Sequence, residues 1–255
     1  MKNIVKGNEP DKLMTYRENN PQGTWQNCKN NKNRRIAIQK KLLEDQGGLC
    51  AYCEIDLKVA IGGDEADFRV EHFHPKSDTG TSHNWHLGWG NLLACCHGGS
   101  RSDIVDAADR FSSPDHSCDV PKDNENWSDI ILNPLQLPAF PNLFSYTRHS
   151  GGISIHPERC DAISINPIIA QNTIDKLRLD AERLKRLRKP VLNKVNDQLG
   201  EMVSQGIDLT VAQETLAKAY LCKNNNGYWP AFFSALRDYL GDAAEKQLSA
   251  INYTG

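Results

Sequence analysis

The sequence contains no long apolar segment: no run of about 18 or more apolar residues occurs, which excludes a transmembrane helix. Its first residues, MKNIVKGNEPDK, lack the apolar core of a secretory signal, so we expect a cytoplasmic protein without membrane contact. The chain also lacks the G-x-x-x-x-G-K-[ST] motif, so any dependence on ATP would have to come from a partner. It shows no internal repeat and no low-complexity tract. What is present is an ordinary globular composition over 255 residues, enough for one large or two small domains.

Charge is distributed unevenly along the chain, although the net charge is only −2. Residues 29–41 contain six Lys or Arg and no acid, and residues 173–194 contain eight against three acids. Residues 97–129 are acidic. Two basic faces would suit a polyanion such as nucleic acid, but the same charges are equally typical of solvated helix faces.

Eight cysteines in a cytoplasmic chain indicate metal ligation or inert burial rather than disulfides. Cys50 and Cys53 form a Cys-x-x-Cys pair, a spacing that lets two thiolates reach one tetrahedral zinc ion. Redox pairs share this spacing, but the βαβ context of a redox protein is missing. A four-thiolate zinc site therefore requires a second pair further along the chain.

The next two cysteines, Cys95 and Cys96, are adjacent, which is an unfavourable geometry for two ligands of one ion. Cys96 and Cys118 would serve instead if residues 97–117 loop out between them, which leaves Cys95 as a buried bystander. The competing set uses both adjacent cysteines and strains the geometry.

The stretch VEHFHPKS, residues 70–77, places a carboxylate beside a histidine at the end of an expected strand. Glu71 would offer a hard oxygen ligand to a divalent cation, and His72 would deprotonate a water molecule for attack on phosphorus. Alternation along a strand puts these side chains on opposite faces unless the strand ends or bulges there. A surface turn with incidental histidines is the alternative interpretation.

The overall pattern predicts an α+β unit followed by a mainly helical C-terminal part. Residues 1–33 are polar and predict an extended arm, and an amphipathic helix should begin near residue 34 and end at Gly47 and Gly48. The other elements expected before residue 160 are a turn entering a strand at 49–57, a strand ending near 72, a helix or loop at 89–96, an inserted loop from 98 to 126, and a hairpin at 143–156.

Helical spacing dominates after residue 171. The spacing predicts a helix over 172–199, capped by Asn172 or Thr173 and kinked or broken at Pro190. Two shorter helices are expected over 208–221 and 228–240.

The ordered motifs resemble the HNH nuclease family, whose members have a ββα-metal fold. The motifs that carry the resemblance are CAYCE, VEHFHPKS, WGNLLACCHGG and HSCDVPKDN, in that order. ILNP and NTIDKLRLDAERLKRLR narrow it to the HNH subunit of Septu and retron-associated anti-phage systems, over residues 30–200. The resemblance implies a zinc-stabilised HNH core at 34–170 with an insertion at 97–117, and a helical region at 171–255 for partner or nucleic-acid contacts.

The resemblance also implies roles for particular residues. His72 would be the general base, Asn91 would orient it, and Glu71 with Asp119 would bind a catalytic Mg²⁺ or Mn²⁺. Cys50, Cys53, Cys96 and Cys118 would hold a structural zinc ion.

One of these assignments departs from the family pattern. Asp119 stands where many members have histidine or asparagine, which leaves His97 and His116 as alternative ligands. The residues expected to contact nucleic acid are Lys76, Lys122, Arg183 and Arg186.

The function implied is a metal-dependent endonuclease that hydrolyses DNA or RNA, tRNA included, within an anti-phage complex. Its expected partners are an ABC-type P-loop ATPase and, in retron versions, a reverse transcriptase with its multicopy single-stranded DNA. The alternative is a zinc-stabilised nucleic-acid-binding module without catalysis, in which the carboxylates and histidine are incidental.

Overall fold

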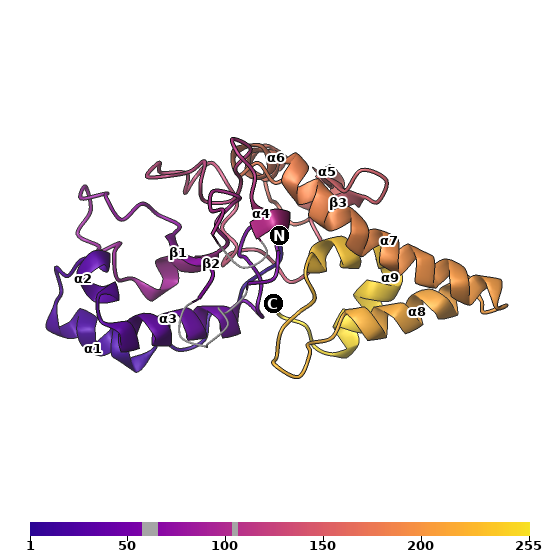
Figure 1. Ribbon diagram of the computed structural model, residues 1–255, viewed down its shortest axis with the longest axis horizontal. Helices are drawn as coiled ribbons and strands as arrows, with labels where there is room; N and C mark the ends of the chain where they lie inside the picture. Colours follow the sequence, from indigo (N-terminus) through magenta and orange to yellow (C-terminus); the bar gives the residue numbers. More distant parts are fainter. Residues whose placement is uncertain (58–65, 104–106) are drawn as a thin grey trace.

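Helices and two small antiparallel sheets make up the chain, which confirms the mixed α and β composition (Figure 1). The computed structural model describes residues 1–57, 66–103 and 107–255. In Figure 1 the N-terminal elements, α1 to α3 with β1 and β2, lie on one side, and α7 to α9 lie on the other. The two termini are neighbours, since Asn3 Nδ2 donates to the carbonyl of Thr254 at 2.6 Å.

The extended arm predicted for residues 1–33 is wrong, because this segment folds into helices that pack against the rest of the chain. Helix α1 spans Asp11–Asn19 and helix α2 spans Trp25–Lys29. Leu13, Trp25 and Cys28 are buried in the main hydrophobic core. The apolar residues of this polar segment are widely spaced and show no periodicity, but several of them are buried against the rest of the chain.

The predicted amphipathic helix is confirmed as α3, Lys32–Asp45. The Asn31 side chain caps its first turn by accepting from the backbone N–H of Arg34, and three apolar residues on one face are buried. Gly47 and Gly48 follow with φ of 62° and 79°, and the N–H of Gly48 donates to the carbonyl of Leu43. Only glycine adopts such a backbone without strain, which ends the helix where the sequence indicated.

The central sheet consists of β1, Arg69–His72, and β2, Leu92–Cys95, paired antiparallel. The predicted strand ending near residue 72 is therefore confirmed. The helix or loop expected at 89–96 is wrong: a single 3₁₀ turn, Trp89–Asn91, leads directly into β2. All four residues of β2 are buried, and a short apolar run of this kind has no alternation from which a strand could be inferred.

The region after β2 is largely irregular, as expected of an insertion. Its described residues include one short helix, α4 at Ala107–Arg110, and residues 104–106 of the predicted loop lie outside the described part of the chain. Residues 118–124 form consecutive turns where a ββα unit would have its helix. The turn at Cys50–Cys53 is present, but an isolated bridge between Leu49 and Asp56 replaces the strand expected after it.

The predicted hairpin is confirmed as β3, Phe144–Thr147, and β4, Gly152–Ile155. Two helices that the sequence did not reveal as separate units follow: α5, Pro157–Ala162, and α6, Pro167–Lys176.

The long C-terminal helix begins later than predicted. Asn166, not Asn172 or Thr173, caps α6, and the chain then turns through the left-handed Arg178 before α7, Glu182–Ser204. Pro190 lies inside α7 without ending it. Buried apolar residues on both sides of the proline hold the helix against its neighbours, so tertiary packing outweighs the lost hydrogen bond.

The last two helices are confirmed as α8, Leu209–Tyr220, and α9, Phe233–Ala250. They pack on α7 around a second core that includes Trp229 and Tyr253. Of the helices described, none combines the length and the apolar composition needed to cross a membrane. The domain boundaries at residues 34 and 171 stay predictions.

Candidate active site and metal centre

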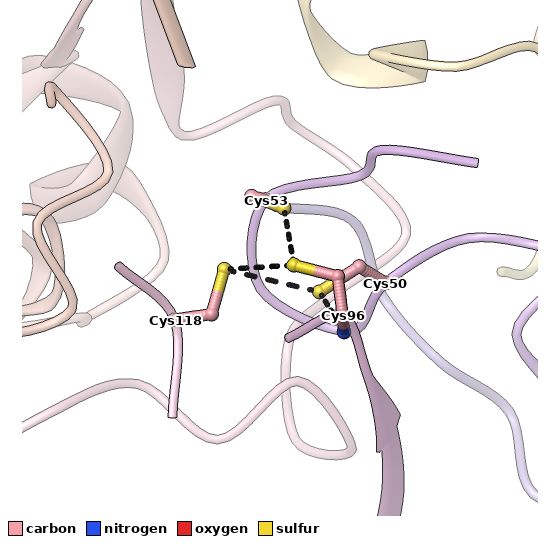
Figure 2. A group of neighbouring side chains, drawn as sticks. All are labelled: Cys50, Cys53, Cys96 and Cys118. Atoms are coloured by element: carbon pink, nitrogen blue, oxygen red, sulfur yellow. Dashed lines mark hydrogen bonds between the residues drawn. The ribbon is translucent and has the colours of Figure 1, made fainter. Parts of the chain in front are cut away.

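Four buried cysteines meet at one point between the central sheet and the end of the insertion (Figure 2). Their sulfur atoms all lie within 4.8 Å of one another. The Sγ–Sγ distances are 3.6 Å for Cys96–Cys118, 3.7 Å for Cys53–Cys96 and 4.0 Å for Cys50–Cys118. Tetrahedral zinc with bonds of about 2.3 Å requires sulfurs about 3.8 Å apart, so these thiols fit the ion. The group consists of Cys50, Cys53, Cys96 and Cys118.

The structure thus brings together the four cysteines expected from the sequence, including the split second pair, and their role as zinc ligands stays a prediction. Cys96 directly follows β2, and its backbone N–H points at Cys50 Sγ, 3.4 Å away. Cys95, the last residue of β2, is buried outside the group, because neighbouring residues of a strand face opposite sides.

The ends of the insertion are joined beside the cysteines. The N–H of Ser117 donates to the carbonyl of Gly98 at 2.9 Å. Gly98 has φ of 60°, and a Cβ there would collide with the Ser117 carbonyl, so only glycine allows this approach. Residues 98 and 117 thereby bring Cys118 back to Cys96 across the loop.

Arg183 of α7 supports the cysteine cluster and does not face solvent. Only 2% of the residue is exposed, and its guanidinium donates to Ser117 Oγ at 2.5 Å. Burial alone would lower the pKa of Arg183, but the nearby Cys96, Cys53 and Cys118 raise it. The expectation that Arg183 contacts nucleic acid is wrong in this fold, since a buried guanidinium has no access to a phosphate.

Two ion pairs join β1 to the turn that follows Cys118. Glu71 Oε1 is 3.0 Å from Lys122 Nζ, and Asp119 Oδ1 accepts from Arg69 Nη2 at 2.8 Å. Burial, and to a lesser extent the charge of Glu71, raises the pKa of Asp119 to about 7. Carboxylate oxygens are the preferred ligands of a divalent cation, so Glu71 and Asp119 offer a donor type that suits such an ion.

Lys122 is only 1% exposed, so the expectation that it contacts nucleic acid is also wrong. Its ammonium group donates to the backbone carbonyl of His72 at 3.1 Å as well as pairing with Glu71. Lys122 thus ties the turn after Cys118 to the end of β1. Of the other expected contacts, Arg186 is exposed and Lys76 is half-buried.

The ring of His72 is held by one hydrogen bond and one aromatic contact. Its Nε2 lies 3.1 Å from the backbone carbonyl oxygen of His86. The Trp25 ring packs edge-on against it, with 5.4 Å between the ring centroids. A carbonyl only accepts, so Nε2 carries the proton and Nδ1 has the free lone pair. Burial lowers the pKa of His72 to about 3, which keeps the ring neutral.

Asn91 acts differently from the role that the resemblance implied. Its side chain accepts from the N–H of His74 at 2.7 Å and donates to the carbonyls of His74 and Trp85, both at 2.9 Å. Asn91 therefore fixes the loop between β1 and β2 and not the His72 ring. The group that orients the ring is the His86 carbonyl, and a backbone contact of this kind has no signal in the sequence.

Glu71 and His72 have separate surroundings, as strand alternation indicated. Neither a hydrogen bond nor an ion pair joins the two side chains among the described residues. Of the alternative ligands, His97 lies 3.5 Å from an oxygen of Asp67, and His116 is half-buried. Sequence reasoning missed Arg69, although a residue two positions before Glu71 is expected on the same face of a strand.

No family model matches the chain. A protein from Escherichia coli assigned as the HNH endonuclease of retron Ec83 is 34% identical over 218 residues, which cover 77% of this chain and 81% of that protein. The chain belongs to the HNH endonuclease family. HNH endonucleases are hydrolases, and the family resemblance inferred from the motifs is thereby confirmed.

In this HNH chain, the four-cysteine cluster lies directly beside the two carboxylates. Cys118 and Asp119 are consecutive, and Cys96 follows the strand that pairs with β1. An ion held by the thiolates would therefore also fix the positions of Glu71 and Asp119.

Proposed function

We propose that this HNH endonuclease hydrolyses phosphodiester bonds of DNA or RNA with the help of Mg²⁺ or Mn²⁺. The observation that carries the proposal is the hydrogen bond from His72 Nε2 to the carbonyl of His86, at 3.1 Å. It leaves the lone pair of Nδ1 free on a neutral imidazole, and the pKa of this buried ring, about 3 without substrate, must rise when a phosphate binds for Nδ1 to act as an effective base.

In this proposal the base and the cation ligands are different residues. His72 accepts the proton of the attacking water at Nδ1, while Glu71 and Asp119 hold the divalent cation. A cation bound there would neutralise the charge that develops on the phosphate oxygens and the leaving oxygen. Arg69 and Lys122 keep the two carboxylates ordered by pairing with them.

Zinc would serve structure and not chemistry, because four thiolates complete its shell and leave no open position. Binding of zinc to such a site contributes folding free energy on the order of 10 kcal/mol. The neighbouring carboxylates depend on that contribution for their placement.

Substrate contacts are proposed for Lys76 and for the exposed Arg186 of α7. Lys76 lines a cavity of about 490 Å³ together with His83 and His86, and the carbonyl of His86 holds the proposed base. A cationic side chain at this position would meet a phosphate near His72. No feature of the cavity distinguishes DNA from RNA.

The retron context of the E. coli relative supports a role in a bacterial anti-phage complex of the Septu or retron type. We propose that an ABC-type ATPase is a partner, consistent with the absence of a P-loop motif from this chain. A reverse transcriptase with its multicopy DNA would be a further partner. The exposed Lys189 and Lys194 of α7 are proposed to contribute to the docking surface for these partners.

Cleavage assays with and without the metal test the proposal. Zinc-loaded protein, alone and with its ATPase, is incubated with plasmid DNA, single-stranded DNA and tRNA in Mg²⁺, Mn²⁺ or EDTA. We expect cleavage only with the added cation, and a loss of about 100-fold or more in rate for His72→Ala.

His149→Ala is the matched control, because His149 is exposed at the turn of the β3–β4 hairpin and should leave cleavage unchanged. Full activity of His72→Ala would refute the mechanism. Absence of cleavage under every condition would refute the proposed activity.

A further inference from the structure

Two tryptophan rings in the loop between β1 and β2, residues 73–91, have no role in the proposed mechanism. Trp85 and Trp89 are half-buried, and both line a cavity of about 790 Å³, which we call the aromatic cavity. Ligand sites in proteins have volumes of about 300–1,000 Å³ and combine aromatic side chains with a few polar groups. The aromatic cavity therefore has the size and the lining of a binding site for a planar group.

Contacts within the protein hold both indole rings in place. The Trp85 ring stacks on the His74 ring, with 3.8 Å between the ring centroids. Trp89 Nε1 donates to the carbonyl of Gly7 at 3.0 Å, and Lys6 Nζ lies 3.5 Å from the centroid of the Trp89 ring. His74 and Lys6 are not among the described residues that line the aromatic cavity, so each ring faces it with another part of its surface. The two rings are thus fixed before any ligand binds, which lowers the entropic cost of binding.

The aromatic cavity adjoins the place proposed for the cleaved phosphate. Residues 82–85 line it and also line the cavity of about 490 Å³ that contains Lys76 and His86. The carbonyl of His86 orients the proposed base, His72. A strand whose phosphate lies beside Lys76 would therefore reach the aromatic cavity with a neighbouring nucleotide.

The charges around the aromatic cavity suit a base better than a phosphate. Its lining includes the carboxylates of Glu9 and Glu18 and the guanidinium of Arg17. Arg17 donates to Glu9 from Nε at 3.3 Å and from Nη2 at 2.7 Å, so its charge is already matched and Glu18 leaves an excess of negative charge. Negative charge repels a phosphate, whereas carboxylate oxygens accept hydrogen bonds from the amino groups of bases.

We propose that the aromatic cavity binds an unpaired base of the substrate, stacked against the rings of Trp85 and Trp89, while the adjacent phosphate lies near Lys76 and His72. The inference rests on the proposed function and names its substrate class, which is nucleic acid that is unpaired at the cleavage site. A base inside a duplex already stacks on its neighbours, so it must leave the helix before it contacts an indole ring. Stacking on aromatic side chains accepts any base, because every base has a π face.

Two glycines provide a variant and its matched control. Gly90 lines the aromatic cavity, and Gly200 lies on the exposed side of α7. At both positions an added Cβ meets no atom within 4 Å beyond the adjoining chain, and neither glycine has a positive φ. Leucine therefore fits at either position without strain. Gly90→Leu places a side chain in the aromatic cavity, and Gly200→Leu adds the same side chain elsewhere, with no contact removed in either variant.

The test measures binding by fluorescence anisotropy, with zinc-loaded full chain and without Mg²⁺ or Mn²⁺, so that no cleavage occurs. The probes are a labelled single strand, the same strand annealed to its complement, and a fully abasic strand of equal length. We expect wild type to bind the single strand more tightly than the other two probes. For Gly90→Leu we expect a Kd for the single strand about 10-fold weaker and an unchanged Kd for the abasic strand. Gly200→Leu should match wild type with every probe.

Three results would overturn the inference. The first is a wild-type protein that binds the duplex or the abasic strand as tightly as the single strand. The second is a Gly90→Leu variant with the wild-type Kd for the single strand. The third is an equal loss of affinity for the normal and the abasic strand, which would indicate contacts with the backbone alone.

A second measurement uses wild-type protein only. A single strand that carries iodouracil is irradiated in the complex, and the cross-linked peptide is identified by mass spectrometry. We expect cross-links at Trp85 or Trp89, and cross-links confined to other residues would overturn the inference.

Cleavage assays separate this inference from the proposed function. Equal rates of cleavage for duplex and single strand would leave the nuclease activity standing and overturn the base site. Binding that depends on bases and is weakened in Gly90→Leu, without cleavage under any condition, would remove the nuclease activity and keep the base site.

Discussion

Cys95 and Cys96 provide the sharpest test of the metal centre, because the two residues are adjacent, both are buried, and only one belongs to the cysteine cluster. Replacing each in turn with alanine removes one thiol from nearly the same position in the chain. If zinc holds the core together, Cys96→Ala should lose zinc and stability, whereas Cys95→Ala should keep both.

The expected difference follows from the geometry. Cys96 Sγ lies 3.7 Å from Cys53 Sγ and 3.6 Å from Cys118 Sγ, so Cys96→Ala removes one corner of the tetrahedron. Structural zinc contributes on the order of 10 kcal/mol, which equals the whole stability of a typical domain, about 5–15 kcal/mol. Cys95→Ala loses only the packing of one buried sulfur, about 1 kcal/mol.

The assay combines zinc content after gel filtration with urea unfolding in the presence and absence of EDTA. Wild type and Cys95→Ala should each retain one zinc per chain and lose most of their stability in EDTA. Cys96→Ala should carry little or no zinc and unfold at low urea with or without the chelator. A zinc-loaded Cys96→Ala with a wild-type midpoint would refute the reasoning, and so would loss of zinc in Cys95→Ala.

Four further variants test the burial of charge and the long helix. Lys122→Met leaves the Glu71 carboxylate buried without its ion pair, so the free energy of unfolding should fall by about 3–5 kcal/mol in urea titrations; a change below about 1 kcal/mol would contradict the buried pair. Arg183→Met should lower the unfolding free energy by about 2 kcal/mol through loss of a charged hydrogen bond. Arg186→Met should leave stability unchanged but weaken nucleic-acid binding and reduce its salt dependence, measured by fluorescence anisotropy. The contrast between buried Arg183 and exposed Arg186 would be refuted if Arg183→Met weakened only binding and Arg186→Met lowered only stability. Pro190→Ala should raise the melting temperature, because proline inside a helix is about 3 kcal/mol less favourable than alanine, and a lower melting temperature would count against an unbroken α7.

Much of the candidate site could be predicted from the sequence because its signals are local. The spacing of Cys50 and Cys53 defines half of a zinc site, and the motif around His72 marks the end of a strand. A capping residue, an apolar face and two glycines at its end predict helix α3. In each case the residues that decide the structure are near one another in the chain.

Other features depended on partners that are distant in sequence. Strand β2 is a strand because it pairs with β1, and its apolar residues alone do not distinguish strand from helix. The helices of the first 33 residues form against a core to which they contribute Leu13 and Trp25. Pro190 fails to break α7 because packing on both sides of it outweighs a local preference.

The sequence by itself determined which residues are able to bind metal and to act as a base, since cysteine spacing and the Glu-His pair depend on covalent neighbours. Only the tertiary structure decided what Lys122, Arg183 and Asn91 do. The sequence suggested nucleic-acid contacts for Lys122 and Arg183 and a contact with the His72 ring for Asn91, but each of the three is buried by elements from elsewhere in the chain. A buried polar group must be satisfied by whatever surrounds it, so its role is set by the fold and not by its position in the sequence.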